Sequence, residues 1–352
     1  MASVTIYDVA ARAGVSIKTV SRVMNNEPNV RPAMRDRVLE AAEALNYSPN
    51  LSARSLAGSR SFVIAVFVDA ALTIDHWKSE RGADYLSRIQ LGATLQCRDA
   101  GYHLLIELID HDAPRVRQEV ASLLAALKPD GVILTPPSSD NQTVLELLDK
   151  AGTPYVRLGP ERPDGGGPRV HMDDVAAARE MTQHLARLGH RRIGFIVGEQ
   201  RYGASQARRQ GYMAAMKELN LPVSDTWVRQ GDFTFQSGLE QAKALLALPE
   251  RPTAIFASND DMALGCLAAA AEAGLMAPGE ISVAGFDDSP SARFSRPQLT
   301  TVRQPVVEMA SLATRLLISG QIRSATSKDP PLDELLPFEL IHRASTAPPL
   351  AP

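Results

Sequence analysis

Cysteine is nearly absent from this chain of 352 residues, and no apolar run is long. The two cysteines, Cys97 and Cys266, lie in patterns with helical spacing and form neither a metal-ligand motif nor a redox motif. We expect both to be small buried hydrophobic residues in a reducing compartment. No stretch approaches the roughly 18 apolar residues of a membrane span, and the start, Met-Ala-Ser-Val, lacks the apolar core of an export signal. These absences favour a protein of the cytoplasm.

Sequence motifs of common enzyme classes are also missing. No Gly-x-Gly-x-x-Gly follows an expected strand, and there is neither a Walker lysine loop nor a Gly-x-Ser-x-Gly elbow. The glycine run 165–167 fits no strand-to-helix pattern and is expected to be a surface loop. His171 could suggest a metal site, but no further ligand spacing supports it, and Asp173-Asp174 are expected to cap a helix over Val175–Leu188. We therefore expect no enzymatic activity, no cofactor and no bound metal.

Residues 5–25 follow the pattern of two short helices joined by a tight turn. Thr5 and Ser16 are expected to cap the helices, and Gly14 permits the sharp reversal between them. Apolar side chains at helical spacing would pack the two helices together: Ile6, Val9, Ala10, Val20, Val23 and Met24. The other face of the second helix carries side chains suited to base edges and phosphates: Ile17, Lys18, Ser21, Arg22 and Asn25. Spacing alone would equally describe an ordinary helical hairpin inside a larger domain.

The residues that follow favour DNA binding over that alternative. A third amphipathic helix is expected over residues 32–45, with Val38, Leu39, Ala42 and Leu45 facing inward. Three small helices could form a compact unit of about fifty residues. Residues 1–60 carry eight Lys and Arg against five Asp and Glu, a net charge of +3, which leaves −6 for the remainder. A basic head on an acidic body is typical of nucleic-acid contact through one end of a protein.

The rest of the chain alternates apolar runs with longer amphipathic stretches. Seven runs are expected to be strands: 62–68, 103–107, 131–135, 154–158, 192–197, 253–258 and 281–286. Near-continuous apolar strands separated by helices favour parallel sheets covered on both faces, an α/β architecture. About 285 residues are enough for two lobes with separate cores.

Polar and aromatic side chains follow these runs, where ligands bind in open parallel sheets. The expected cleft residues are Asp69, Ser205, Arg208, Phe233, Phe235, Asn259, Asp260, Asp287 and Asp288. Carboxylates and amides pair with adjacent hydroxyls, and an aromatic face stacks on a sugar ring, so this set suits a small polyhydroxylated ligand or a purine. Other interpretations remain open. Asn259, Asp260 and Asp288 could cap helices or turns, Arg208 could pair with Glu218, and Phe233 could belong to a core.

Several separate motifs, in matching order and spacing, resemble the lactose-repressor (LacI/GalR) family of bacterial transcription regulators. They are Tyr7-Asp-Val-Ala10, Ala13-Gly-Val-Ser16, Thr19-Val-Ser-Arg-Val23, Leu45-Asn-Tyr-Ser-Pro-Asn50 and Ala53-Arg-Ser-Leu-Ala-Gly58. The resemblance implies a helix-turn-helix domain, a hinge, a two-lobed body like periplasmic binding proteins, and a tail, over residues 1–48, 49–60, 61–345 and 346–352. The lobes are expected at about 61–160 with 292–320, and at 161–291 with 321–345.

For DNA, the resemblance implies a homodimer that places two recognition helices in successive major grooves of a near-palindromic operator. Lys18 and Arg22 would donate to guanine, and Ile17 would contact a thymine methyl, while Ser21 would reach bases or phosphate. Contacts that fix the register on the backbone are expected from Thr5, Tyr7, Ser16, Thr19, Asn25 and Tyr47. In the hinge, which by composition alone would be an ordinary linker, Leu56 would wedge into a base step, with Asn50, Ala53 and Arg54 on sugar and phosphate.

For the effector, the resemblance implies that the positions of Arg208, Phe233, Asn259 and Asp287 hold it, with Asp69, Tyr85 and Gln90 as further candidates. Two features depart from the family pattern. Gly159 stands where many sugar-responsive relatives have an acid, and segment 69–84, which contains Trp77, is longer than usual.

The expected function is a nucleoid-associated repressor that a small sugar-like effector releases from DNA. The alternatives are a regulator with a purine or another metabolite as corepressor, and a sugar-binding transport protein, which would leave residues 1–60 unexplained. Residues 346–352 bring no leucine heptads, so a dimer is expected rather than a tetramer.

Overall fold

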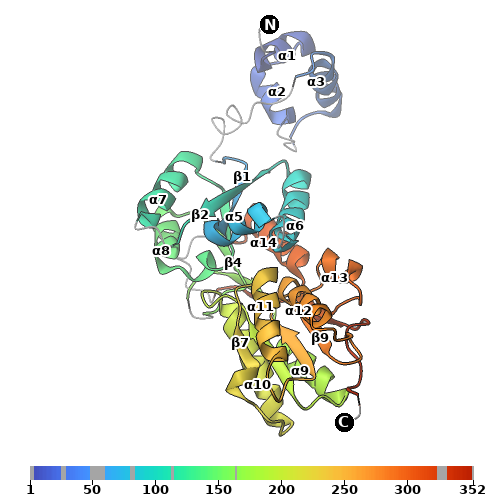
Figure 1. Cartoon of the computed structure of the whole chain (residues 1–352). Helices are drawn as coiled ribbons and strands as arrows, with labels where there is room; N and C mark the ends of the chain where they lie inside the picture. The colour runs from blue at the N-terminus through green and yellow to red at the C-terminus, as the bar shows by residue number, and fades with distance from the viewer. Residues whose placement is uncertain are drawn as a thin grey trace. The chain divides into compact units, whose positions relative to one another are not determined.

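The chain forms two compact units, Met1–Phe62 and Val63–Pro352, here called the head and the body. In the computed structural model, the described residues are 4–24, 29–47, 60–79, 84–111, 115–162, 165–322 and 331–350 (Figure 1).

The described residues of the head form three helices whose ends follow from local sequence. They are α1 (Ile6–Ala13), α2 (Ile17–Met24) and α3 (Pro32–Ala44). At the start of α1 the backbone N–H of Thr5 donates to the Asp8 carboxylate at 2.8 Å. At the start of α2 the N–H of Thr19 donates to Ser16 Oγ at 3.2 Å. Gly14, with φ of +62°, reverses the chain between these helices, so both predicted caps and the predicted turn are confirmed.

The three helices close on a small apolar core. Its buried members are Val9, Ala10, Ala13, Val20, Val23, Val38, Ala41 and Ala42, with Ile6, Met24, Leu45 and Tyr47 packed partly buried against them. The prediction for Leu39 was wrong, since this side chain is 47% exposed. Val38, Ala41 and Ala42 are spaced three and four residues apart and form the buried face of α3. Leu39 directly follows Val38 and therefore points to a different side of the helix.

One charged side chain fixes the turn between the first two helices. The guanidinium of Arg37, on α3, donates to the carbonyl oxygens of Ala13, from Nε at 3.2 Å, and of Gly14, from Nη2 at 3.1 Å. These carbonyls are left without partners where α1 ends, so Arg37 satisfies them and joins α3 to the turn.

The body holds two six-stranded sheets, each of which defines a lobe. In lobe 1 the strand order is β11-β5-β4-β3-β1-β2, and every neighbouring pair is parallel. The strands are β1 (Val63–Asp69), β2 (His103–Ile109), β3 (Gly131–Leu134), β4 (Tyr155–Leu158), β5 (Arg169–His171) and β11 (Asp333–Leu335). Helices α7 (Val116–Leu127) and α8 (Gln142–Ala151) cover one face, and α6 (Asp84–Ala100) and α14 (Val306–Ile318) the other (Figure 1). A further helix, α5 (Ala70–Ser79), follows β1 directly, and η1 (Ser138–Asp140) follows β3.

Lobe 2 has the strand order β12-β10-β9-β8-β6-β7, in which only β12 is antiparallel among the described strands. Its strands are β6 (Ile193–Val197), β7 (Val228–Gln230), β8 (Ala254–Ala257), β9 (Ser282–Asp287), β10 (Thr300–Arg303) and β12 (Glu339–Ile341). Helices α9 (Asp174–Arg187) and α10 (Gly203–Glu218) pack on one face, and α11 (Phe235–Leu246) and α12 (Asp260–Glu272) on the other. Short helices η2 (Asp225–Trp227) and α13 (Pro290–Phe294) complete it.

The predicted α/β fold with parallel sheets is confirmed, but the predicted lobe boundaries were wrong. Strands β5 and β11 pair within the lobe 1 sheet, whereas β10 pairs with β9 in lobe 2. The chain therefore passes between lobes after β5, after β10 and after β11. Each of these strands is only three or four residues long, too short to show a strand pattern in the sequence.

The glycine run after β4 lies at the surface as predicted, with Gly166 exposed, and it also covers a fully buried arginine. Arg157 donates to Ser139 O at 2.6 Å, to Gly166 O at 2.9 Å and to the Asp140 carboxylate at 2.8 Å. A Cβ at Gly165 would lie 2.6 Å from the Arg157 guanidinium, so only glycine permits this approach. The predicted surface loop is thus a cover over a buried ion pair.

Both cysteines are buried, Cys97 in α6 and Cys266 in α12, as predicted. Within the described ranges, no helix combines the length and apolar character needed to cross a bilayer. The same residues contain no cluster of three or more His, Cys, Asp or Glu placed to hold a metal ion.

We predict that Arg37→Met loosens the turn between α1 and α2, because two helix-end carbonyls lose their charged donor. Hydrogen bonds to charged groups contribute about 1.5–3 kcal/mol, so local opening should become roughly tenfold to a hundredfold easier. Amide hydrogen exchange of residues 5–24 in the full chain measures this, with the body helices as internal reference. Unchanged protection of these amides would show that Arg37 does not hold the turn.

Candidate functional site

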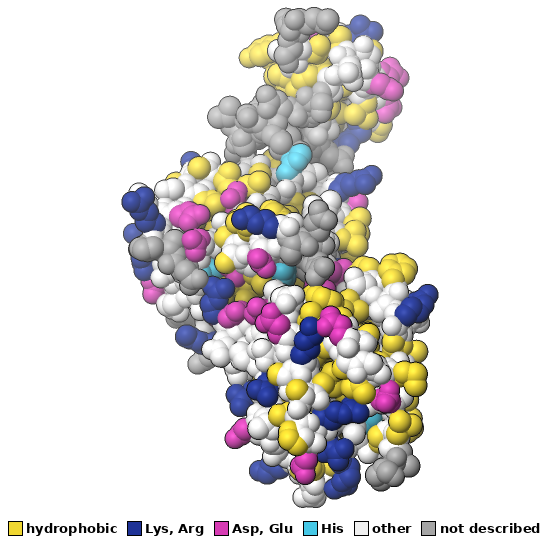
Figure 2. Space-filling view, in the orientation of Figure 1, with side chains coloured by type: hydrophobic (Ala, Val, Ile, Leu, Met, Phe, Trp, Pro, Cys, Tyr) yellow, Lys and Arg dark blue, Asp and Glu magenta, His cyan; other side chains and the backbone are white. Residues whose placement is uncertain are grey.

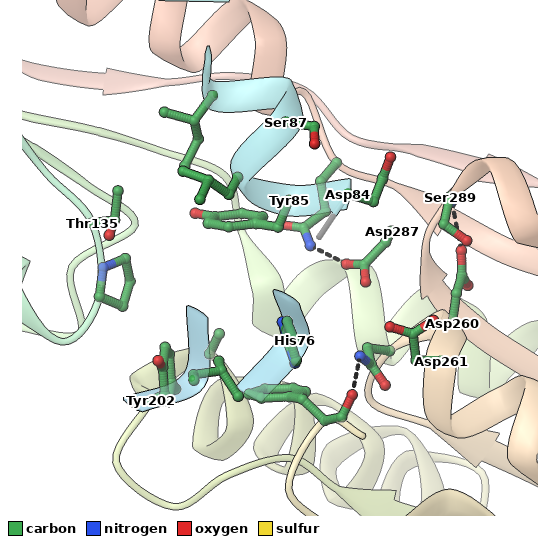
Figure 3. Close-up of a pocket in the computed structure, with 18 of the residues that line it drawn as sticks. His76, Asp84, Tyr85, Ser87, Thr135, Tyr202, Asp260, Asp261, Asp287 and Ser289 are labelled. Carbon is green, nitrogen blue, oxygen red and sulfur yellow. Dashed lines mark hydrogen bonds between the residues drawn. The ribbon is translucent and has the colours of Figure 1, made fainter. Parts of the chain in front are cut away.

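A cavity of about 620 Å³ lies between the two sheets of the body, at the carboxyl ends of their strands. In lobe 1, β1 lies between β2 and β3, and in lobe 2, β6 lies between β7 and β8. Strand order reverses at both places, which is where open α/β sheets bind ligands. Asp69 at the end of β1, Thr135 after β3 and Asn259 after β8 all line the cavity. Figure 3 shows Thr135 and, from lobe 2, Tyr202 and Asp287.

Nearly all of the predicted effector residues meet in this cavity. Its lining includes Asp69, Tyr85, Arg208, Phe233, Asn259 and Asp287. Gln90 does not contribute to the lining and is exposed on α6. It follows Tyr85 by five residues, which turns it well away from the face that Tyr85 presents.

Arg208 is a buried, fully oriented cation in the cavity wall, with 4% of its surface exposed. Its Nε donates to Asp174 at 2.8 Å, and its Nη1 donates to Ser258 O at 2.6 Å. The guanidinium also lies 3.7 Å from the centre of the Phe286 ring. The alternative pairing with Glu218 does not occur, because Glu218 pairs with Arg179.

Asp287 presents a carboxylate beside this cation. Gln304 donates to its Oδ1. Burial raises the pKa of Asp287 to about 7, an effect that the nearby Arg208 guanidinium opposes. A carboxyl with this pKa changes between acceptor and donor near neutral pH.

Asp260 is structural and does not cap α12 as expected. It accepts from Thr301 Oγ1 at 2.6 Å and from the Ser289 N–H at 2.7 Å, and burial raises its pKa well above the ordinary value. The cap of α12 is Asn259, whose Oδ1 accepts from the Met262 N–H at 3.0 Å.

The Asn259 amide also fixes the aromatic wall of the cavity. Its Nδ2 donates to Phe233 O at 2.8 Å, and this holds Phe233 at a φ of +71°. The Phe233 ring packs on Gly198, where an added Cβ would lie 2.1 Å from it, and meets Tyr202 edge-on at 5.7 Å. Phe233 is therefore both a buried packing residue and part of the lining.

Among the described residues, Arg201, Tyr202 and Arg88 join the lobes beside the cavity. Arg201 Nη2 of lobe 2 lies 3.9 Å from the Asp69 carboxylate of lobe 1. Tyr202 of lobe 2 donates to Asp69 of lobe 1 at 2.6 Å. Arg88, on α6, donates to Asp287 O at 2.7 Å and to Asp288 O, and it pairs with Asp84 at 2.8 Å. Each contact therefore depends on how far the lobes are closed.

Sequence reasoning missed Arg88, Asp174, Tyr202 and Gln304. Tyr202 follows a strand run and could have been found by the rule that located Asn259. Asp173-Asp174 were expected to cap α9, and Asp173 does so by accepting from the Ala176 N–H at 2.8 Å, whereas Asp174 pairs with Arg208. Asp288 is neither a helix cap nor a turn cap, since it pairs with Arg293, Arg303 and Arg343.

The head presents much of its predicted DNA-reading face to solvent. Tyr7 is 67% exposed and Ile17 41%, and Lys18 and Arg22 are also exposed. Thr5 and Ser16 are exposed at the helix starts, whereas Thr19, Ser21 and Tyr47 are partly buried. The predictions for Asn25, Asn50, Ala53, Arg54 and Leu56 fall outside the described residues. Figure 2 shows acidic and basic side chains interspersed over the face of the body in view.

A helix-turn-helix head joined to a two-lobed body with a ligand-sized cavity defines a class of ligand-responsive DNA-binding proteins. The family profile "Bacterial regulatory proteins, lacI family" matches residues 5–50, and "Periplasmic binding protein-like domain" matches residues 182–346. The chain is 35% identical to catabolite control protein A of Priestia megaterium over 90% of this chain and 92% of that protein. It is 33% identical to the repressor PurR of Actinobacillus pleuropneumoniae serotype 3, over 97% and 98%.

Solved structures agree with these relatives. The lac repressor dimer bound to operator and the anti-inducer ONPF matches with a TM-score of 0.80 and 27% identity, over 98% of this chain and 100% of that one. The regulator CelR in complex with cellobiose matches with a TM-score of 0.71 and 30% identity, over 97% and 99%. The chain belongs to the lacI family of bacterial regulatory proteins, and it is a transcriptional regulator. The resemblance seen in the sequence is confirmed.

We predict that Arg88→Ala weakens the association of the lobes, because two hydrogen bonds from a charged donor to lobe 2 are lost. Amide exchange should rise at residues 84–92 and 286–289 in the ligand-free protein. Arg88→Lys keeps the charge but lacks the several N–H donors of the guanidinium. Its amide exchange should therefore lie between that of the wild type and that of Arg88→Ala. Equal exchange in all three proteins would rule out a bridging role.

We predict that Asp287→Asn stabilises the body at high pH only. The folded pKa of Asp287, about 7, exceeds the ordinary value of 3.8, so the folded state binds more protons than the unfolded state between these values. Wild-type stability therefore decreases as pH rises from about 4 to 7, and Asn removes this loss. Urea unfolding at pH 5 and 8 measures the difference between the two proteins, with Asp225→Asn on the surface as control. A difference that does not grow with pH contradicts the assignment.

Proposed function

We propose that the protein is a homodimeric repressor in the cytoplasm, at the nucleoid, whose grip on operator DNA is released by a small sugar-like effector. One observation carries this proposal. A single chain combines a capped helix-turn-helix, with Lys18 and Arg22 exposed on its second helix, and a cavity of about 620 Å³ at two strand-order reversals. The relatives named above, a repressor bound to operator and a regulator bound to cellobiose, support it.

On DNA, Lys18 and Arg22 donate to guanine, and Ile17 contacts a thymine methyl in the major groove. Contacts to the DNA backbone fix the register of the head on the duplex. They come from Thr5, Tyr7, Ser16, Thr19, Ser21, Asn25 and Tyr47. Asn50, Ala53, Arg54 and Leu56 complete the minor-groove contact of the hinge. Two copies bind half-sites about one helical turn apart.

In the cavity, the Asp287 and Asp69 carboxylates accept from ring hydroxyls, and Arg208 donates to a ring or hydroxyl oxygen. Phe233 supplies a face for the apolar side of the ring. Asn259 acts mainly by holding Phe233, because both ends of its amide already have protein partners. A ligand with many hydroxyl groups suits this lining better than a purine does, because carboxylates are the commonest polar groups of the lining.

The effector acts by changing how far the lobes are closed. Gln304 lies on a segment that crosses between the lobes, and it donates to Asp287. A ligand bound at Asp287 is therefore next to a segment that connects the two lobes. A ligand shifts DNA affinity only by its differential affinity for the two conformations, and a hundredfold release requires about 2.7 kcal/mol of coupling. No enzymatic step is part of this function.

We predict that the full-length protein binds one of its genomic promoter fragments selectively, with an affinity that falls as salt rises. Arg22→Ala should lose about 1–3 kcal/mol of discrimination, roughly tenfold to a hundredfold, because a bidentate guanine contact is removed. Competition gel shifts against random DNA measure it, with Arg209→Ala, an exposed arginine of the body, as matched control. If no fragment is preferred, whether or not sugars and purines are added, the proposal is wrong.

A further inference from the structure

Helix α5 forms a wall of the cavity that the predicted effector residues do not account for. It directly follows Asp69, in the segment expected from the sequence to be longer than the family pattern. Its cavity-lining side chains are Leu72, Thr73, His76 and Trp77. Spacings of one, four and five residues place these side chains on one face of the helix. Figure 3 shows His76 reaching into the space that Tyr85 and Asp287 also face.

Trp77 gives this wall an aromatic surface that the protein itself leaves half uncovered. The side chain lines the cavity, yet 51% of its surface is exposed. Covering apolar area is favourable by about 25 cal/mol per Å², and an indole is the largest such surface that a side chain can offer. A ligand that extends to Trp77 therefore gains contact that a ligand confined to Arg208 and Asp287 does not.

The volume of the cavity exceeds what one sugar ring fills. A hexose has about a dozen heavy atoms, and since a water molecule takes about 30 Å³ of liquid, one ring fills at most about 360 Å³. The cavity measures about 620 Å³. One ring among Asp69, Arg208 and Asp287 therefore leaves at least about 260 Å³ of the cavity for further parts of a larger ligand.

The charge of the lining limits the chemistry of both rings. Six carboxyl groups contribute to it: Asp69, Asp84, Asp174, Asp260, Asp261 and Asp287. Arg208 is the only arginine or lysine in the same lining, and Asp174 already pairs with it. From outside the lining, Arg88 pairs with Asp84, and Arg201 lies 3.9 Å from Asp69. An incoming phosphate or uronate group would find only the already paired Arg208 as a lysine or arginine of the lining, so the lining discriminates against anionic sugars.

We propose that α5 forms a second sugar position in which Trp77 stacks on the outer ring of a neutral oligosaccharide, while the Arg208–Asp287 cluster holds the inner ring. The effector class is therefore a neutral disaccharide or longer, not a monosaccharide or a sugar acid. This inference rests on the proposed sugar-responsive function and deepens it.

The test is calorimetric titration of the full-length protein with matched sugar pairs. The pairs are glucose with cellobiose and maltose, galactose with lactose and melibiose, mannose with mannobiose, and xylose with xylobiose. We expect one disaccharide to bind at least tenfold more tightly than its own monosaccharide. Trp77→Ala should weaken that disaccharide about tenfold, since stacking and covered area are lost, and leave the monosaccharide within about twofold. Ile74→Ala, an exposed residue of α5 outside the lining, is the matched control.

The outcomes separate this inference from the function on which it rests. If monosaccharides bind as tightly as disaccharides, or if Trp77→Ala weakens both equally, the second position is wrong and the sugar-responsive function stands. Tighter binding of glucuronate or glucose 6-phosphate than of the neutral sugars would overturn the charge argument. If no sugar binds but adenine, guanine or hypoxanthine does, the proposed effector class fails and this inference fails with it.

Discussion

The guanidinium of Arg208 is the interaction on which the cavity of the body depends. Three strand ends of lobe 2, those of β8, β9 and β10, direct acids and amides toward one small volume. This alone would be unfavourable, because like charges and buried polar groups would face each other. Arg208 pairs with Asp174, binds the carbonyl that ends β8 and covers the Phe286 ring. One cation thus ties α9, α10, β8 and β9 together, and Asp287 can stay beside it without a dedicated partner cation. The cost of collecting carboxylates where a ligand binds is offset within lobe 2 itself.

Contacts between the lobes use the same elements as the ligand site. Tyr202 reaches Asp69 while its ring meets Phe233, and Arg88 binds the carbonyls of the turn that carries Asp287. The crossing residue Gln304 donates to Asp287 itself. Ligand binding and lobe closure are therefore not separate events joined by a long pathway, because the same few side chains take part in both. This is the local two-state element that a ligand needs if it is to bias a conformation.

The sequence was sufficient for features that local chemistry decides. Caps at Thr5 and Ser16, the glycine turn, the apolar strand runs and the polar residues after them each follow from a short pattern, and the structure contains them. Short strands such as β5 and β11 were not predictable, because three residues carry no periodicity and their pairing is decided by the tertiary fold. For the same reason the predicted crossing points were misplaced.

Pairing partners at long range were equally beyond prediction. Asp260 and Asn259 are adjacent in the chain, and either could cap α12. Only the positions of Thr301 and Ser289, decided by the tertiary fold, assign Asp260 to the interior. No sequence pattern singled out Arg88, because its carbonyl partners lie 199 and 200 residues away. The effector residues carried over by resemblance met in the cavity except Gln90, whose helical position turns it outward.

The interleaving of the two lobes has a consequence for how the protein is made. Lobe 1 is complete only when α14 and β11 have been added, and lobe 2 only when β12 and Arg343, which pairs with Asp288, have followed. Lobe 1 cannot finish folding on the ribosome before residue 335 has been synthesised, and lobe 2 cannot before residue 343. The head is translated first and closes on its own apolar core. During synthesis, therefore, the helix-turn-helix matures well before the cavity that regulates it exists.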